Sequence, residues 1–194
     1  MEADRLIVSL FDYTGIWSQP YRDAGYEVLQ VDIQHGMDIF TTPKPESAHG
    51  VILQPPCTDF ALSGARWFAE KDQDGRTEAS IKLAKAGLDW VVSLNPVWWV
   101  LENPISRIHK LIPELGKPVY KFHPYHFGEP ISKMTWLWGN FNTDLKQNVV
   151  EPEGMRKNQP PAWYSKVGGK SQATKNYRSR TSPAFAKAFF DANP

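Results

Sequence analysis

The chain has 194 residues, of which 41% are hydrophobic and 22% charged, with a formal net charge of +1. This balance predicts one soluble domain with a buried core, and it gives no bulk electrostatic signature of nucleic-acid binding. A single cysteine excludes an internal disulfide, and neither a membrane-spanning run nor a signal-peptide pattern is found. We therefore expect a cytoplasmic protein with no membrane partner.

Short apolar runs alternate with helical patterns through the first half of the chain. The runs at 6–11, 26–33, 49–53 and 97–101 predict buried strands. Helices are predicted between Gly15 and residue 24 and over residues 77–94, where apolar residues recur at a spacing near 3.6. This alternation predicts an α/β fold with a mostly parallel sheet and helices on both faces.

The second half has a weaker pattern. Residues 134–141 predict a late strand, and residues 142–180 predict an irregular basic excursion. Residues 182–192 predict a closing helix, with Ser182 as its N-cap and Pro183 at the first helical position. Because no internal repeat or second domain is indicated, we expect a single domain over residues 1–194.

Polar or reactive residues follow four of the predicted strands. Residues 12–15 follow the first strand, Asp32 ends the second, Cys57 comes after the third, and Glu102 with Asn103 follows the fourth. In an open parallel sheet, ligands bind beyond the carboxyl ends of the strands. We therefore expect these four groups to meet at one edge of the sheet.

The first turn and Asp32 are the candidate site for a nucleoside. The turn contains one glycine, Gly15, and lacks the G-x-G-x-x-G pattern that cradles a dinucleotide pyrophosphate. An acidic residue after the second strand is suited to hydrogen bonding with ribose hydroxyls. A tight turn with a solvated carboxylate explains these residues equally well.

Cys57 is the candidate nucleophile. Pro55 and Pro56 rigidify the strand exit before it, and a loop that reaches Gly64 follows. A lone cysteine is more often a small buried hydrophobe, so its position at a strand end carries the prediction. Catalysis needs the thiolate, and Arg66 in the following loop is a source of nearby positive charge.

Glu102 is the candidate acid. It lies beyond an apolar strand, where partial burial raises the pKa of a carboxyl group. A protonated carboxyl in this position donates a hydrogen bond to a ring nitrogen and makes the ring more electrophilic. A helix-capping or salt-bridged glutamate is the alternative.

Together these motifs resemble those of the DNA cytosine-C5 methyltransferases. The match is closer still to the short methylase-like proteins of phage and prophage genomes, which lack a large target-recognition domain. The residues that carry the resemblance are 9–15, Asp32, 36–39, the P-P-C loop at 54–64, Glu102 with Asn103 and Pro104, and the late segments 127–130, 137–139 and 180–186.

The resemblance implies a Rossmann-like S-adenosylmethionine-dependent methyltransferase fold and a DNA cytosine-5 methylation activity in a bacterial or phage-infected cell. In that reaction the Cys57 thiolate adds to C6 of cytosine and Glu102 hydrogen-bonds the ring, so that C5 accepts the methyl group. The implied cofactor contacts are Phe11, Asp12, Thr14, Gly15, Asp32, Ile33, Asp38, Ile39 and Pro55. The implied substrate contacts are Pro56, Phe60, Gly64, Arg66, Asn103 and Lys133, and no metal is expected.

Two departures from the family pattern leave other functions open. Lys133 stands where the family carries arginines, and lysine lacks their bidentate fork. Only residues 142–180 stand in place of a recognition domain, and their cations predict either a phosphate-binding stretch or a solvated loop. These cations are Arg156, Lys157, Lys166, Lys170, Lys175, Arg178 and Arg180. The alternatives are the same chemistry on a nucleotide, single-stranded DNA or RNA, and a non-catalytic relative that binds DNA, cofactor or a protein partner.

Overall fold

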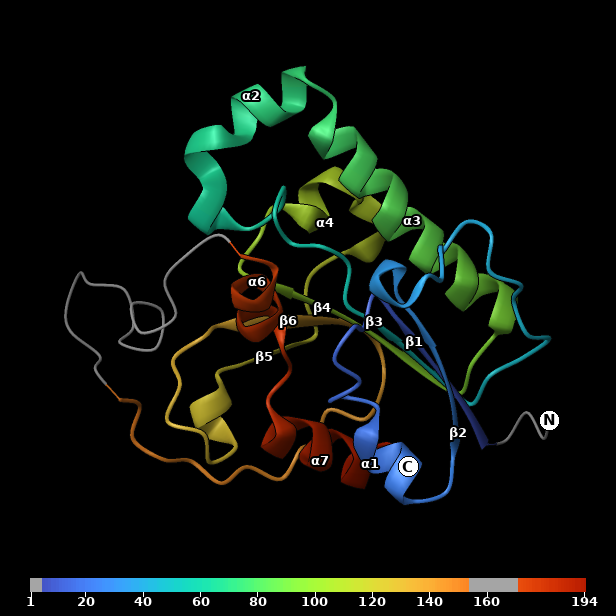
Figure 1. The fold of residues 1–194 in the computed structure, drawn as a ribbon. Coiled ribbons are helices and arrows are strands. Elements are labelled where there is room, and N and C mark those ends of the chain that lie inside the picture. The colour runs from blue at the N-terminus through green and yellow to red at the C-terminus, as the bar shows by residue number, and fades with distance from the viewer. Residues whose placement is uncertain (1–4, 154–170) are drawn as a thin grey trace.

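A six-stranded mixed sheet runs through the middle of the molecule, with strand order β2-β1-β3-β4-β6-β5 (Figure 1). The computed structural model describes residues 5–153 and 171–194. The strands are β1 (Leu6–Leu10), β2 (Glu27–Val31), β3 (Gly50–Leu53), β4 (Trp98–Pro104), β5 (Tyr120–Phe122) and β6 (Thr135–Asn140). Strands β1 to β4 are mutually parallel, and β6 is antiparallel to both β4 and β5. The predicted α/β class with a mostly parallel sheet is confirmed.

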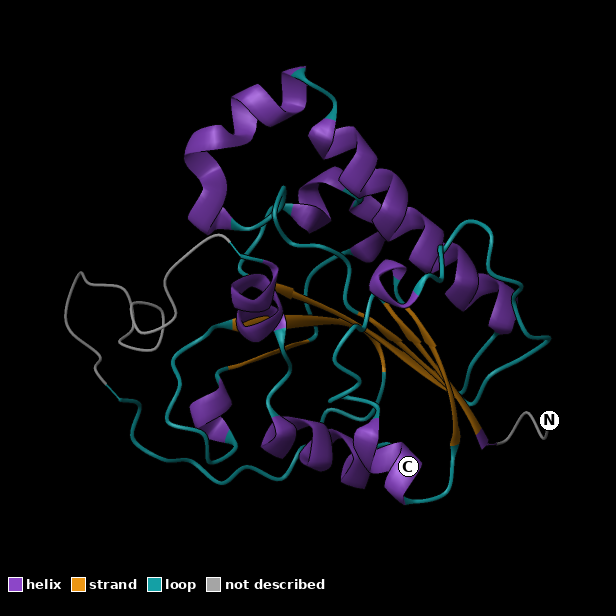
Figure 2. Ribbon diagram, viewed as in Figure 1, coloured by secondary structure: helices purple, strands orange, loops and turns teal. Residues whose placement is uncertain are grey.

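Helices cover both faces of the sheet (Figure 2). One face packs against α3 (Arg76–Leu94), whose Trp90 joins Val8 of β1 in a buried cluster. The other face packs against α1 (Gln19–Asp23) and α7 (Pro183–Ala192), where Phe189 joins Ile7 of β1. Because side chains alternate along a strand, β1 supplies both clusters, and all five of its residues are buried.

The remaining helical elements lie between the strands or before the last helix. They are α2 (Phe68–Gln73), α4 (Ile108–Leu111), α6 (Gln172–Ser179), and the 3₁₀ turns η2 (Ile33–His35), η3 (Leu62–Trp67), η4 (Pro113–Leu115) and η5 (Pro124–His126). Among the residues that the structure describes, no helix combines the length and apolar character needed to cross a bilayer.

Most predicted elements are found within a few residues of their expected bounds. The closing helix begins as predicted, since the Ser182 side chain accepts a hydrogen bond from the Phe185 N–H at 3.2 Å and Pro183 is its first residue. The prediction of an irregular excursion over 142–180 is wrong for residues 172–179, which form α6 and are capped by Ser171. This helix buries no side chain, so no apolar periodicity marked it. Residues 154–170, with Arg156, Lys157, Lys166 and Lys170, lie outside the described residues.

Candidate active site

The ends of the parallel strands lie level at one edge of the sheet. Leu10 of β1 pairs with Val31 of β2 and with Leu53 of β3, and Leu53 pairs with Leu101 of β4. The next residue of each strand therefore stands beside the others in one row. That row consists of Phe11, Asp32, Gln54 and Glu102.

Glu102 and Asn103 face this edge from β4. Burial raises the pKa of Glu102, and the positive charge of Lys133 partly opposes that rise. The Asn103 side chain is fully buried, and its Nδ2 donates a hydrogen bond to the Pro55 carbonyl at 3.2 Å. Its Oδ1 has no partner among the described residues. Asn103 therefore joins the end of β4 to the segment that carries Cys57.

Cys57 lies close enough to Glu102 and Lys133 for their charges to act on its thiol. Burial is the main cause that raises the thiol pKa, the Glu102 carboxylate raises it further, and Lys133 lowers it. Arg66, which the sequence predicts as the helpful cation, instead lies over the Trp67 ring at 5.1 Å. The structure thus brings together a thiol, a carboxyl group and an ammonium group from three segments of the chain.

The loop after Cys57 begins with one tight turn. The Cys57 carbonyl accepts hydrogen bonds from the N–H groups of Phe60 at 3.0 Å and Ala61 at 2.8 Å, and Gly64 N–H closes a second turn on Ala61. The Phe60 ring is fully buried in the core beneath α3, whereas Pro56 is exposed. Phe60 therefore anchors the loop in the protein interior.

The first turn is closed by the side chain of Asp12. This buried carboxylate accepts hydrogen bonds from Ser9 Oγ and from the Gly15 N–H, both at 2.8 Å, and a longer one from Thr14 Oγ1 at 3.4 Å. Phe11 has a φ of 59°, in the left-handed region that a residue other than glycine rarely adopts. The Asp12 carboxylate therefore faces the turn itself, and its hydrogen bonds hold the backbone in this conformation.

The end of β2 presents a carboxylate next to an apolar side chain. Asp32 Oδ1 accepts a hydrogen bond from the Gln34 N–H at 2.8 Å, and Ile33 is 70% exposed. Asp38 uses its Oδ1 to cap the Phe40 N–H at 2.9 Å, while Ile39 is buried and its carbonyl accepts from Trp90 Nε1. Ile33 is thus the member of this group that faces solvent most openly, while Asp32 and Asp38 are half-buried.

Two features of this edge were missed in the sequence. The Tyr13 and His35 rings stack with centroids 5.1 Å apart, which joins the first turn to the end of β2. From the far end of the chain, Asn176 of α6 donates to Gln34 at 3.2 Å, and Thr181 donates to Gln54 at 2.7 Å. Residues so distant in sequence give no local signal of this contact, although Ser171 is a recognisable N-cap.

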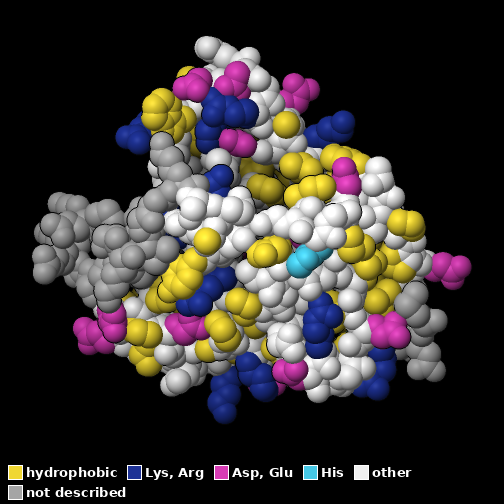
Figure 3. Space-filling view, viewed as in Figure 1, with side chains coloured by type: hydrophobic (Ala, Val, Ile, Leu, Met, Phe, Trp, Pro, Cys, Tyr) yellow, Lys and Arg dark blue, Asp and Glu magenta, His cyan; other side chains and the backbone are white. Residues whose placement is uncertain are grey.

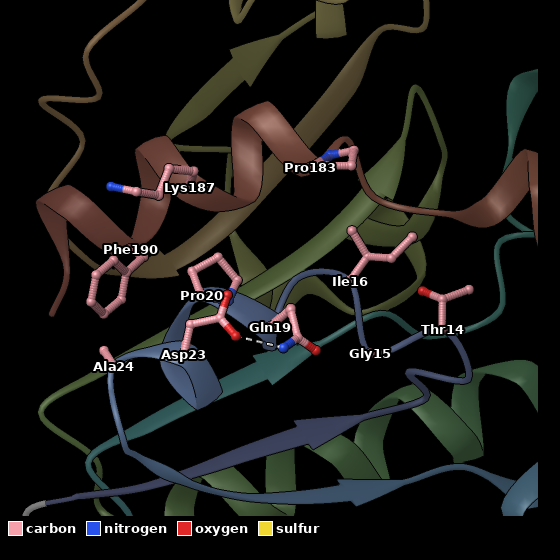
Figure 4. A pocket seen from close by; sticks show the side chains of 10 residues that line it. All are labelled: Thr14, Gly15, Ile16, Gln19, Pro20, Asp23, Ala24, Pro183, Lys187 and Phe190. Carbon is pink, nitrogen blue, oxygen red and sulfur yellow. Dashed lines mark hydrogen bonds between the residues drawn. The ribbon is translucent and has the colours of Figure 1, made fainter.

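A groove of about 600 Å³ runs between α1 and α7. Figure 4 shows Lys187 and Phe190 of α7 on one side of it, Pro20 of α1 on the other, and Thr14 and Gly15 at one end. In the space-filling view, hydrophobic side chains mark the surface below α3, and charges of both signs gather over α2 (Figure 3). The groove thus borders the first turn, while Cys57 is not among its lining residues.

No family model and no curated protein sequence matches the chain. Among solved structures, it is similar to a DNA modification methyltransferase encoded within an E. coli prophage, with 17% identity and a TM-score of 0.50. That match covers 84% of this chain and 53% of the other, so the chain spans about half its length. The Entamoeba histolytica methyltransferase EhMeth matches over 76% of this chain and 57% of its own, with 13% identity and a TM-score of 0.46. The first of these similarities shows that the chain shares the α/β fold of the prophage-encoded protein.

Proposed function

We propose that the chain is an S-adenosylmethionine-dependent methyltransferase that modifies C5 of cytosine in DNA. The observation that carries the proposal is the electrostatic contact between Cys57 and Glu102 at the ends of adjacent parallel strands, with Lys133 acting on both. A nucleophile and a carboxyl group whose pKa values are raised at a shared strand edge are typical of a functional site. The similarity to a DNA modification methyltransferase supports the choice of DNA.

The ends of β1 and β2 fit the nucleoside part of the cofactor. One oxygen of Asp32 is bonded to Gln34, and the other has no partner among the described residues, which leaves it for a ribose hydroxyl. The exposed Ile33 side chain offers an apolar face to a purine ring, and the Gly15 backbone can approach a ligand closely. When bound, the cofactor supplies the methyl group.

The chain's own groups then divide the remaining chemistry. Cys57 gives its proton to water, and its sulfur forms a bond to C6 of cytosine, which breaks the C5–C6 π bond and places the electron pair at C5. Glu102, which burial favours in its protonated form, donates a hydrogen bond to N3 and stabilises the electron-rich ring. After methylation, water takes the C5 proton, and the electron pair of the broken C–H bond re-forms the C5–C6 double bond and expels the Cys57 thiolate.

Because the pKa of Cys57 is raised, the site needs a group that favours the thiolate before the sulfur can attack. In the free protein the thiol holds its proton near neutral pH, because burial disfavours the thiolate, and the charges of Asp59 and of Glu102, when it is ionised, add to that effect. Lys133 is the charged group that favours the thiolate, since its positive charge lowers the thiol pKa, and a backbone hydrogen bond at Cys57 lowers it further. We therefore assign Lys133 the role of stabilising the nucleophile as the substrate enters.

A mechanism-based adduct tests the proposal. Duplex DNA containing 5-fluorocytosine, incubated with the protein and S-adenosylmethionine, is expected to give a covalent complex on a denaturing gel, because fluorine cannot leave C5 as a proton does. Cys57→Ala is expected to abolish the complex, and Thr58→Ser, at the exposed neighbouring residue, to retain it. An adduct with single-stranded DNA, RNA or a nucleotide alone would move the activity to that substrate. No adduct and no transfer of labelled methyl to any pyrimidine would refute the proposal.

A further inference from the structure

Buried charges lie behind the nucleophile loop, which we define as residues 57–60. Lys71 of α2 is only 6% exposed, and its ammonium group lies 3.0 Å from Asp59 Oδ1 and 2.5 Å from the Thr58 carbonyl oxygen. Ser80 of α3 donates to the other oxygen of the Asp59 carboxylate at 2.6 Å. The Asp59 side chain therefore points into the protein, and both of its oxygens are bonded.

Arg107 binds the same loop from the other side. Its guanidinium group donates to the Asp59 carbonyl from Nε at 3.3 Å and from Nη2 at 3.2 Å. It also forms a bidentate pair with Asp72 at 2.8 and 2.7 Å, and it lies 3.6 Å from the centroid of the Phe68 ring. Such a planar, two-pronged contact fixes the orientation of the arginine as well as its position.

The loop carbonyls are all bonded within the protein. The Cys57 carbonyl accepts from the N–H groups of the following turn, and the Phe60 carbonyl accepts from the Arg107 N–H at 2.9 Å. The Thr58 carbonyl accepts a hydrogen bond from the Lys71 side chain, and the Asp59 carbonyl accepts one from the Arg107 side chain. Backbone polar groups in a surface loop are commonly bonded to water, so this arrangement removes much of the freedom such a loop has.

Arg107 also connects the loop to the strand that carries Glu102. It lies five residues after Glu102, in the segment that follows β4. In this region Leu62 N–H donates to the Ile105 carbonyl at 2.9 Å, so the two segments are hydrogen-bonded side by side. A displacement of Arg107 would therefore move the nucleophile loop relative to the carboxyl group.

We propose that Lys71 and Arg107 are positioning residues, which hold the Cys57 thiol in its half-buried location near Glu102 without touching the substrate. Their catalytic effect rests on the proposed function, whereas their effect on the thiol does not. A buried ion pair is weak as a source of stability, because desolvation offsets the attraction, but it can fix one arrangement of the groups around it. A nucleophile that is held in one position spends more of its time in the geometry needed for attack.

Alkylation of Cys57 tests the proposal directly. Cys57 is the only cysteine, so its reaction with iodoacetamide can be followed on the full chain by mass spectrometry across pH. In Lys71→Met the loop is released and the thiol becomes more exposed, while the unpaired Asp59 carboxylate raises the thiol pKa, so we expect alkylation faster by about tenfold at pH 10 and a smaller increase at pH 8. Formation of the adduct with 5-fluorocytosine DNA should slow in the same variant through its maximal rate, with the DNA concentration at half of that rate unchanged. Arg107→Met should behave alike, and Arg107→Lys should recover part of the loss.

A matched control tests whether the change in alkylation rate depends on bonds to the nucleophile loop or on the loss of any nearby charge. Arg76 forms ion pairs with Glu70 and Asp74 beside the same two helices and does not bond the loop, so Arg76→Gln should leave alkylation unchanged. If Lys71→Met does not fold, Ser80→Ala removes one bond of Asp59 and should still increase the rate. Thermal unfolding of each variant distinguishes loop release from global unfolding.

An alkylation rate within twofold of the wild type at every pH, in each variant that folds, would overturn the proposal. A rate that rises only in proportion to global unfolding would overturn it equally. If alkylation responds as expected while the wild-type protein forms no adduct with any pyrimidine, the positioning of the thiol stands and the proposed methyltransferase function fails. The two proposals therefore fail on different measurements.

Discussion

Replacement of Glu102 by glutamine and of Lys133 by glutamine should change the reactivity of Cys57 in opposite directions. The negative charge of Glu102 raises the thiol pKa, and the positive charge of Lys133 lowers it. Both substitutions remove a charge and keep a polar side chain. Opposite effects on the alkylation rate are expected only if both charges act on the Cys57 thiol as the structure indicates.

The magnitude follows from the thiolate fraction. Below the thiol pKa, each unit of pKa shift changes that fraction, and therefore the alkylation rate, by about tenfold. A charge near a titrating group commonly shifts its pKa by about one unit or more. We therefore expect Lys133→Gln to slow alkylation at pH 8 by about tenfold, and Glu102→Gln to speed it by about tenfold at the pH values where the wild-type Glu102 is ionised. The effect of Glu102→Gln requires that the wild-type Glu102 is ionised. The rate profiles of Glu102→Gln and of the wild type should therefore converge at acidic pH.

The assay is the pH profile of iodoacetamide modification between about pH 5 and 10, read as the rate for the single cysteine. Methyl transfer in Glu102→Gln is expected to fall even though the thiol becomes more reactive, because the hydrogen bond to the pyrimidine ring is weakened. Lys110→Gln, an exposed cation that is not among those that shift the thiol pKa, is the control for Lys133. Equal or same-sign effects of the two substitutions would refute the electrostatic account of the site.

Three further outcomes follow from the structure. Because burial raises the pKa of Glu102, the carboxylate destabilises the folded state once the pH exceeds its ordinary pKa of about 4.5, so Glu102→Gln should gain thermal stability over wild type as pH rises and level off above the raised value. Hydrogen bonds from Arg107 and Thr77 lower the pKa of Asp72 to about 2, so carboxyl NMR should show Asp72 ionised at pH 3 and titrating higher in Arg107→Met. Gly87→Ala would set a Cβ atom 2.8 Å from Leu53 Cδ2, and the overpacking cost of about 1–3 kcal/mol is offset by about 1 kcal/mol of helix propensity, so chemical denaturation should show a net loss of up to about 2 kcal/mol.

The sheet was predictable because its signal is local. Strands buried on both faces require continuous apolar runs, and those runs could be read directly. The three-residue strand β5 and the short helix α2 gave no such pattern, and α6 has no buried face. The elements that the sequence did not predict are short or polar, and tertiary contacts hold them in place.

The candidate site was predictable in its residues and less so in its contacts. The strand-end positions of Cys57 and Glu102 follow from the order of the strands. Which cation acts on the thiol does not, because Lys133 approaches from a later loop while Arg66 turns onto a neighbouring ring. The pairing of Asp59 with Lys71 depends in the same way on how α2 returns to the sheet.

The level row of strand ends has a consequence for changes in chain length. Inserting or deleting one residue within β3 or β4 would move one member of the row by about 3.3 Å and turn its side chain to the other face of the sheet. The connections at the opposite edge, around residues 43–48 and 95–97, carry none of the groups assigned to the site. Insertions and substitutions in these two connections should therefore be tolerated. Changes in the number of residues between a strand and its functional residue should not be tolerated.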